Sequence, residues 1–253
     1  MLPGGRVATL GRPPASRGGR PSFGAGGRRL RMGARAGQRG RRPLTYQGRE
    51  LRCSFRFEAE ARALGFSAVA GADEVGRGAL CGPVLACAVV LPQGFDATGV
   101  DDSKRLTPRQ REALAERIRR QARAVSVGAA EVEEIDRVNI LQATYLALRR
   151  AVLGLTVVPD FLLVDALQIP GLEVPQRGIV KGDAQSVSIA AASIVAKVTR
   201  DALMREWDHR FPGYGLARNM GYGSAGHREA IRALGPSAIH RRSFRGTSER
   251  WLF

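Results

Sequence analysis

Short apolar runs alternate with longer amphipathic stretches along the chain from about Ser54 onward. Small and β-branched residues with turn signals at their ends predict strands at 68–73, 83–91, 124–132, 161–165 and 178–183. Apolar positions repeating every three to four residues predict helices at 57–64, 108–122, 133–153, 188–207 and 225–234. This alternation indicates one α/β domain without internal repeats or a second folded domain.

Two local signals refine this pattern. Gly76-Arg77-Gly78 separates the first two strands, and so short a link favours an antiparallel hairpin. Thr107-Pro108 places an N-cap residue before a proline at the first helical position, which predicts a helix start there.

Composition sets the first fifty residues apart. They contain 12 Arg, 12 Gly and a single acid, Glu50, and cannot bury enough apolar surface to offset the entropy of ordering. We therefore expect a disordered tail over 1–52, then a catalytic domain over 53–253 with a helical C-terminal region from about 208. The tail could bind nucleic acid non-specifically, act as an organelle transit peptide, or result from a start codon assigned too far upstream. The use of only three lysines among 40 basic residues favours the last explanation.

The remaining composition excludes several classes of protein. Cys53, Cys81 and Cys87 show no Cys-x-x-Cys spacing, which predicts buried thiols in a reducing compartment. The three histidines are widely separated and do not favour a zinc site. The longest apolar stretch, 79–92, is interrupted by Gly82-Pro83 and is too short to span a bilayer. We expect a soluble, cytoplasmic protein without membrane association.

Carboxylates mark the candidate chemistry. Asp73, Asp165 and Asp183 each follow an apolar strand, and Glu74 comes directly after the first of them. Strand ends are where sites form in α/β sheets, so these side chains would converge if their strands were neighbours. Oxygen-only ligands favour Mg²⁺ or Mn²⁺, and two such ions could activate water against a phosphodiester.

Each carboxylate also has a plainer interpretation. Asp165 alone is typical of a turn, Asp183 could cap the following helix, and Asp73-Glu74 could be a solvated pair. The occurrence of all three aspartates at one kind of position favours a shared site.

Several segments in order carry a family resemblance. They are Gly71-Ala-Asp-Glu-Val-Gly-Arg-Gly78, Asp102-Ser-Lys-Arg-Leu106, Val164-Asp-Ala166, Val180-Lys-Gly-Asp183, Ile189-Ala-Ala-Ala-Ser-Ile-Val-Ala-Lys-Val-Thr-Arg-Asp201, Gly221-Tyr222 and His240-Arg-Arg-Ser-Phe244. Over about residues 68–245 the chain resembles ribonuclease HII, the bacterial type 2 ribonuclease H.

The resemblance implies a ribonuclease H-like fold: a five-stranded mixed sheet flanked by helices, with a helical C-terminal extension. It implies hydrolysis of RNA within RNA–DNA hybrids and incision 5′ to single ribonucleotides in duplex DNA, leaving 3′-hydroxyl and 5′-phosphate ends. A monomer is the family-like expectation.

The resemblance also implies roles for individual residues. Those matching the family's metal-site carboxylates are Asp73, Glu74, Asp165 and Asp183. Those matching its junction-reading residues are Gly76, Arg77, Gly78 and Tyr222. Those matching positions near phosphates are Lys104, Lys181, Ser193 and Lys197.

Alternatives to these roles stay open. Tyr222 alone is typical of a half-buried core aromatic, and Lys197 of a solvated surface residue. Lys181 could equally offset acidic charge. Met220 stands where the family often has lysine, and Gly223-Ser224 where Pro-Thr is common, which puts a phosphate contact there in doubt.

Rival functions are another nuclease or transposase of the same fold, and a non-catalytic nucleic-acid-binding protein. Ribonuclease HIII fits less well, because the tail is too polar for its extra N-terminal domain. The terminal Trp251-Leu252-Phe253 resembles peptides that dock on sliding clamps, although it could also pack on its own domain.

Overall fold

The computed structural model describes residues 45–46, 49–50 and 53–247, all within the unit Arg42–Phe253. The expected tail therefore lies outside the described residues, apart from an unpredicted pairing of β1 (Thr45–Tyr46) with β2 (Arg49–Glu50). The terminal Trp251-Leu252-Phe253 also lies outside them. The boundary at 52/53 stays a prediction.

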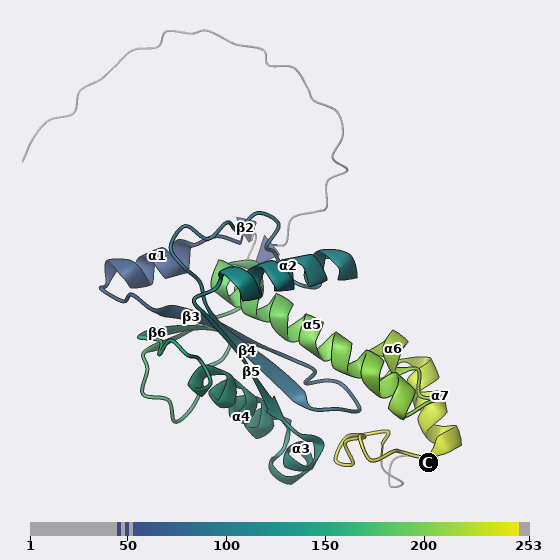
Figure 1. Cartoon of the computed structure of the whole chain (residues 1–253). Coiled ribbons are helices and arrows are strands. Elements are labelled where there is room, and N and C mark those ends of the chain that lie inside the picture. The colour runs from purple at the N-terminus through teal and green to yellow at the C-terminus, as the bar shows by residue number, and fades with distance from the viewer. Residues whose placement is uncertain (1–44, 47–48, 51–52, 248–253) are drawn as a thin grey trace, which may run out of the picture. The chain divides into compact units, whose positions relative to one another are not determined.

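A five-stranded sheet occupies the centre of this unit (Figure 1), in the order β5-β4-β3-β6-β7. Its strands are β3 (Val69–Val75), β4 (Val84–Val90), β5 (Ala124–Ala130), β6 (Phe161–Asp165) and β7 (Gln176–Ile179). The β3–β4 and β4–β5 pairs are antiparallel, whereas β3–β6 and β6–β7 are parallel. The predicted hairpin and mixed sheet are confirmed.

Helices cover both faces of the sheet (Figure 1). Because side chains alternate along a strand, Cys87 and Val89 of β4 pack with α5 (Val187–Arg210) and α2 (Pro108–Gln121). The intervening alanines of β4 pack with α4 (Ile140–Leu153) on the opposite face. The Thr107 side chain caps α2 as predicted, and α1 (Arg56–Ala63) lies close to its predicted position.

Gly71 lets α5 approach β3 closely. A Cβ at this position would lie 2.2 Å from the backbone carbon of Ser188, at the start of α5. Helix α5 can therefore run across the end of β3, which brings Ser193 close to the carboxylates.

The single helix expected at 133–153 is wrong. The structure has α3 (Val132–Val138) and α4, with Asn139 between them at a φ of 73°. The Asn139 Oδ1 accepts hydrogen bonds from the backbone N–H groups of Leu141 and Gln142. Asparagine tolerates the left-handed region and caps helices well, so this residue ends one helix and starts the next.

The strand expected at 178–183 is also wrong in extent. β7 ends at Ile179, Lys181 has a φ of 54°, and Asp183 lies on the short 3₁₀ turn η1 (Gly182–Ala184). The residue that caps α5 is Ser186, so the helix-cap interpretation of Asp183 is wrong as well. A carboxylate on a turn after the strand still faces the same edge of the sheet.

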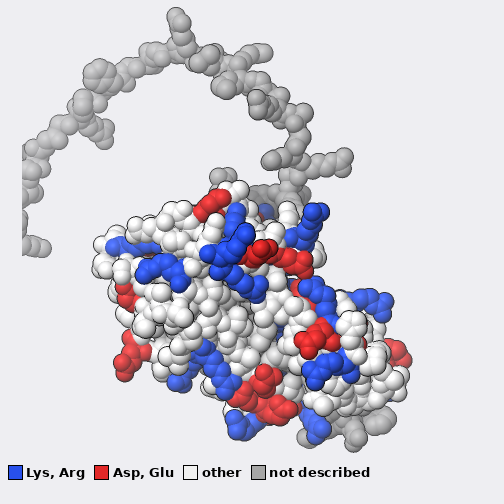
Figure 2. Space-filling model, in the orientation of Figure 1, with Lys and Arg blue, Asp and Glu red and all other residues white. Residues whose placement is uncertain are grey.

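The C-terminal extension contains α6 (Leu216–Asn219) and α7 (Ala225–Leu234). Both pack on the end of α5 through a buried cluster that includes Leu80, Met204 and Ile231. Figure 2 shows basic and acidic side chains interspersed over the face in view. Within the described part of the chain, no helix combines the length and apolarity needed to cross a bilayer.

Candidate active site

The strand pairing brings the first three candidate carboxylates together. Ala72 of β3 lies opposite Val164 of β6, so the residues one step further on, Asp73 and Asp165, are neighbours across two parallel strands. Glu74 extends the same edge. Asp73 is 5% exposed and Glu74 is partly buried.

The turn after β7 supplies the fourth carboxylate. The Asp165 Oδ1 accepts a 2.7 Å hydrogen bond from the backbone N–H of Gly182. This bond ties the end of β6 to η1 and places Asp183, itself 6% exposed, beside the other acids.

The electrostatics show the cost of this arrangement. Burial, followed by the charges of Glu74 and Asp165, raises the pKa of Asp73 well above its usual value. Burial and the nearby Asp183 raise the pKa of Asp165 to about 6. Burial also raises the pKa of Glu74, although Arg77 opposes the shift. The Oε2 atom of Glu74 is buried without a hydrogen-bond partner among the described residues.

Asp73, Glu74 and Asp165 open onto a cleft of about 500 Å³, whereas Asp183 lies beside them but outside the set of residues that lines it. The cleft is lined by Asp73, Glu74, Val75, Gly76, Arg77, Gly78, Ser103, Lys104, Asp165, Ser193, Lys197 and Tyr222. These three carboxylates at one edge of the sheet and the glycine turn thus face one space.

The predicted phosphate-contacting residues fall into two groups. Lys104, Ser193 and Lys197 line the cleft, whereas Lys181 is exposed and outside the set that lines it. The Nζ atom of Lys104 lies 3.0 Å from an oxygen of Asp183. Burial is the largest single effect and lowers the pKa of Lys104, but the hydrogen bond to Asp183 and the charges of the nearby carboxylates together outweigh it, so the net shift is upward.

Ser193 and Lys197 contact the cleft walls. Ser193 lies close enough to the Asp73 carboxylate to oppose the upward shift of the Asp73 pKa, and its Oγ lies 3.0 Å from the Oγ of Ser103. Lys197 forms an ion pair with Asp201 one helical turn further along α5. In this structure each cationic head that lines the cleft on this side has a carboxylate partner within the protein.

The Gly-Arg-Gly turn forms the opposite wall. Gly76 has a φ of 90°, which favours glycine, and a Cβ there would lie 2.6 Å from the guanidinium carbon of Arg200. Gly78 has no such neighbour within 4 Å. The Arg77 Nη1 lies 3.2 Å from Glu74 Oε1, so the turn also contacts the acidic cluster.

Tyr222 completes this wall from the C-terminal extension. It forms an isolated bridge with Ala79, and the Leu80 N–H donates to the carbonyl of Gly221 at 2.8 Å. Its side chain is 37% exposed and lines the cleft, which differs from a core aromatic. Met220 packs instead with the buried C-terminal cluster.

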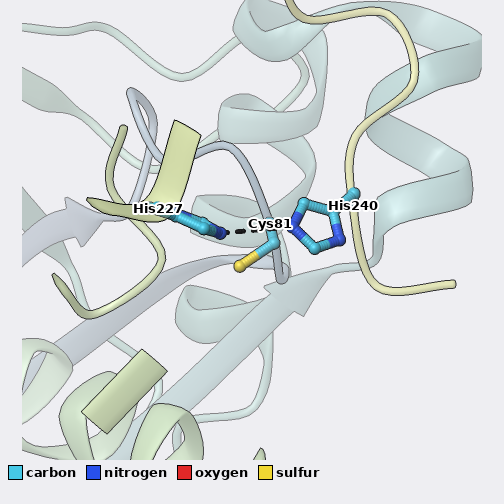
Figure 3. A group of neighbouring side chains, drawn as sticks. All are labelled: Cys81, His227 and His240. Atoms are coloured by element: carbon cyan, nitrogen blue, oxygen red, sulfur yellow. Dashed lines mark hydrogen bonds between the residues drawn. The ribbon is translucent and has the colours of Figure 1, made fainter. Parts of the chain in front are cut away.

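A second cluster supports Tyr222 from behind. Figure 3 shows Cys81, His227 and His240 together, each from a different segment of the chain. The His227 Nδ1 lies 2.9 Å from the Tyr222 carbonyl, and the two Nε2 atoms lie 3.2 Å apart. Although the histidines are distant in sequence, the fold brings two of them into contact.

Hydrogen bonds define the tautomers of this pair. The Ser237 N–H donates to His240 Nδ1, so a neutral His240 carries its proton on Nε2. That proton points to the Nε2 of His227, whose Nδ1–H donates to Tyr222. Only one Nε2 lone pair is then available, and burial raises the pKa of the Cys81 thiol to about 11. The arrangement is a hydrogen-bonded relay rather than a set of metal ligands.

Comparison with known proteins identifies the family. The family model for ribonuclease HII matches residues 70–247. The chain belongs to the ribonuclease HII family. It is 57% identical to ribonuclease HII of Geobacter sulfurreducens over 193 residues, which cover 76% of this chain and 89% of that protein.

Solved structures agree. The ribonuclease H2 of Pyrococcus horikoshii superposes with a TM-score of 0.61 at 28% identity, covering 73% of this chain and 99% of that one. Ribonuclease HII of Archaeoglobus fulgidus, solved in complex with PCNA, gives a TM-score of 0.58 at 27% identity over 68% of this chain and 91% of that one. This ribonuclease HII chain is therefore a divalent-metal-dependent endonuclease of the type 2 ribonuclease H class, acting on RNA–DNA hybrids.

Sequence reasoning assigned no role to several residues that build the site. Ser103 lines the cleft, while Arg200 and Arg241 are fully buried behind the glycine turn. Both arginines lie inside segments that carry the family resemblance, so the sequence did mark these two positions. Nothing in the sequence showed that their side chains point inward.

Proposed function

We propose that Asp73, Glu74, Asp165 and Asp183 hold two divalent ions with which the protein cleaves RNA in hybrids and incises 5′ to single ribonucleotides in duplex DNA. The products would carry 3′-hydroxyl and 5′-phosphate ends. The observation that carries this proposal is the convergence of four carboxylates at one edge of the sheet.

The donor set fits such ions. All four side chains offer oxygen, the donor that Mg²⁺ and Mn²⁺ prefer, and a buried Glu74 oxygen lacks a partner among the described residues. The raised pKa values of Asp73 and Asp165 support this assignment, because a positive charge nearby would favour their ionised forms. Bound there, hard divalent ions supply charge neutralisation and activate water for in-line attack on the phosphodiester.

The protein's own groups would position the substrate. Backbone groups of Gly76, Arg77 and Gly78 can approach the ribose closely enough to contact the 2′-hydroxyl, which distinguishes RNA from DNA. The partly exposed ring of Tyr222 can stack on the following deoxynucleotide.

Polar groups on the other wall would bind the backbone of the nucleic acid. Once ions neutralise Asp183, the exposed head of Lys104 can turn to a phosphate. Ser193 keeps Asp73 oriented, and Lys197 lines the same wall. Lys181 stays a predicted phosphate contact outside the cleft.

Incision of a duplex with one ribonucleotide tests the proposal. The full-length protein should cut this duplex with Mg²⁺ or Mn²⁺ at one position, cut no all-DNA duplex, and lose activity with a chelator. Cutting of both duplexes alike would favour another nuclease of the same fold. The experiment also shows which of the two ions supports faster turnover.

A non-catalytic nucleic-acid-binding protein predicts different behaviour. Removing residues 1–50 would then abolish binding, and Asp73→Asn would change little. We expect the truncated chain to retain cleavage and Asp73→Asn to lose most of it while remaining folded.

Partners outside the cleft form a separate proposal. The complex of the Archaeoglobus fulgidus relative with PCNA favours a contact between a sliding clamp and Trp251-Leu252-Phe253. A pull-down with purified clamp should succeed with the full chain and fail without these residues. Sedimentation would test the expected monomer, and cytoplasmic location stays a prediction.

A further inference from the structure

Two arginines lie entirely inside the protein behind the Gly-Arg-Gly turn. Arg200 of α5 and Arg241 of the C-terminal segment are each 0% exposed. Among the described residues, neither guanidinium forms an ion pair with a carboxylate. A buried charge without a counter-ion is costly unless its donors are satisfied, so these side chains need another explanation than a salt bridge.

Backbone carbonyls of the loop between β3 and β4 accept hydrogen bonds from five of the six guanidinium nitrogens, and the Arg200 Nε is buried without a partner among the described residues. The Arg241 Nε, Nη1 and Nη2 atoms donate to the carbonyls of Gly82, Arg77 and Pro83 at 2.9, 2.9 and 3.1 Å. Arg200 donates to the carbonyls of Cys81 and Pro83. Planar guanidinium groups can bind several carbonyls at once. The two side chains therefore hold the backbone of the loop from its buried side.

The bond to Arg77 determines the orientation of one peptide unit. In a trans peptide the C=O and the following N–H point in opposite directions, and no described peptide bond is cis. Because the Arg77 carbonyl points inward to Arg241, the N–H of Gly78 must point outward. Gly78 lines the cleft, and no hydrogen bond among the described residues uses its N–H.

The neighbouring peptide is held in the same way. The Gly76 carbonyl accepts from the Ala79 N–H at 3.3 Å, and the Arg200 guanidinium fills the space where a Gly76 side chain would be. The turn therefore directs the carbonyls of Gly76 and Arg77 away from the cleft. An anionic or hydroxyl-bearing ligand meets an amide donor rather than carbonyl oxygens.

We propose that Arg241 is a positioning residue for substrate discrimination: by binding the Arg77 carbonyl it presents the Gly78 amide to the ribose 2′-hydroxyl side of the junction. The inference rests on the proposed function. It adds a residue that touches no substrate but determines how the turn meets it.

Arg241→Met tests the inference, because it keeps the length of the side chain and removes the donors. The loss of one oriented hydrogen bond to the substrate is expected to raise the KM for a one-ribonucleotide duplex about tenfold. The inhibition constant of an all-DNA duplex of the same sequence should stay within about twofold, since the loop does not read its backbone. A general loss of structure would weaken the binding of both duplexes alike. Equal changes in the KM and in the inhibition constant would therefore overturn the inference.

Two further variants serve as controls for Arg241→Met. Arg242→Met removes the adjacent, exposed positive charge. It should leave unchanged the ratio of the inhibition constant of the all-DNA duplex to the KM of the one-ribonucleotide duplex. Arg241→Lys keeps the charge, but a single ammonium cannot span three carbonyls, so the ratio should fall as in Arg241→Met. A folded Arg241→Lys protein with the ratio of the unmodified chain would contradict the inference.

A measurement on the unmodified protein is independent of whether the variants fold. In protein labelled with ¹⁵N-glycine, the Gly78 amide resonance should shift when the one-ribonucleotide duplex is added and much less with all-DNA duplex. An unshifted Gly78 resonance would contradict the inference while cleavage of the same duplex still supports the proposed function. Absence of cleavage by the unmodified chain would instead refute the proposed function itself.

Discussion

At the scale of single residues, the acidic site opposes stability. Asp165 has a pKa of about 6 in the folded protein, above the usual value for aspartate. A raised pKa means that its contribution favours folding below about pH 4 and is lost as the pH rises through 6. At pH 8 without metal ions, the ionised group therefore favours unfolding.

Asp165→Asn should accordingly separate activity from stability. Removing a ligand charge should reduce turnover by at least about a hundredfold. Loss of a residue that only hydrogen-bonds a metal ligand already reduces activity by about 10- to 100-fold. In chelator at pH 8 the free energy of unfolding should rise by about 1–2 kcal/mol, after allowance for solvent screening. Urea unfolding and the incision assay would measure both, and a less stable ion-free variant would contradict the electrostatic explanation.

The two glycines of the junction turn provide a matched pair at this scale. Gly76→Ala should cost about 1–3 kcal/mol of stability, because its φ is 90° and its Cβ would meet Arg200. Gly78→Ala should change stability by less than about 0.5 kcal/mol, yet it should weaken substrate binding because its Cβ would occupy the cleft. Thermal unfolding and KM values would show whether the two effects separate as expected.

At the scale of elements, Asn139 decides where α3 ends and α4 begins. Asn139→Ala should cost about 2 kcal/mol, since it loses a helix cap and alanine tolerates a positive φ less well than asparagine. Asn139→Gly can also adopt the positive φ and should cost only a few tenths of a kcal/mol. Chemical denaturation of the two variants would compare them, and equal losses would argue against the contribution of the positive φ.

At the scale of the whole molecule, the His227–His240 relay joins α7, the C-terminal segment and Tyr222. Burial, followed by the neighbouring His227, lowers the pKa of His240 to about 4, and burial also lowers that of His227. A lowered histidine pKa contributes stability that is complete above the usual value of 6.5 and is lost as the pH falls towards 4.

The histidine pair should therefore lower the free energy of unfolding between about pH 6.5 and 4, opposite in sign to the contribution of Asp165, so the expected result is a difference in pH dependence between the unmodified chain and His240→Gln. Urea denaturation at several pH values would measure this slope. Carboxylates with lowered pKa values act mainly below this window; Glu134, for example, has a pKa of about 2 because of Arg150. Equal slopes for both proteins would contradict a buried neutral pair.

The sequence by itself determined the succession of strands and helices, the β3–β4 hairpin, the start of α2 and the identity of the candidate carboxylates. These features follow from local patterns: alternation along strands, helical periodicity, and the chemistry of Thr107-Pro108 and of residues that end strands. It missed the helix break at Asn139 because a positive φ interrupts a periodicity that otherwise continues.

Only the tertiary structure decided which distant groups meet. The order β3-β6-β7 brings Asp73 beside Asp165 and Asp183, and the packing of the C-terminal segment on the β3–β4 loop places Arg241 beneath Arg77. The histidine relay has the same origin. Periodicity reports which face of an element is buried, whereas the partner across that face depends on sheet order and chain crossings that no local pattern encodes.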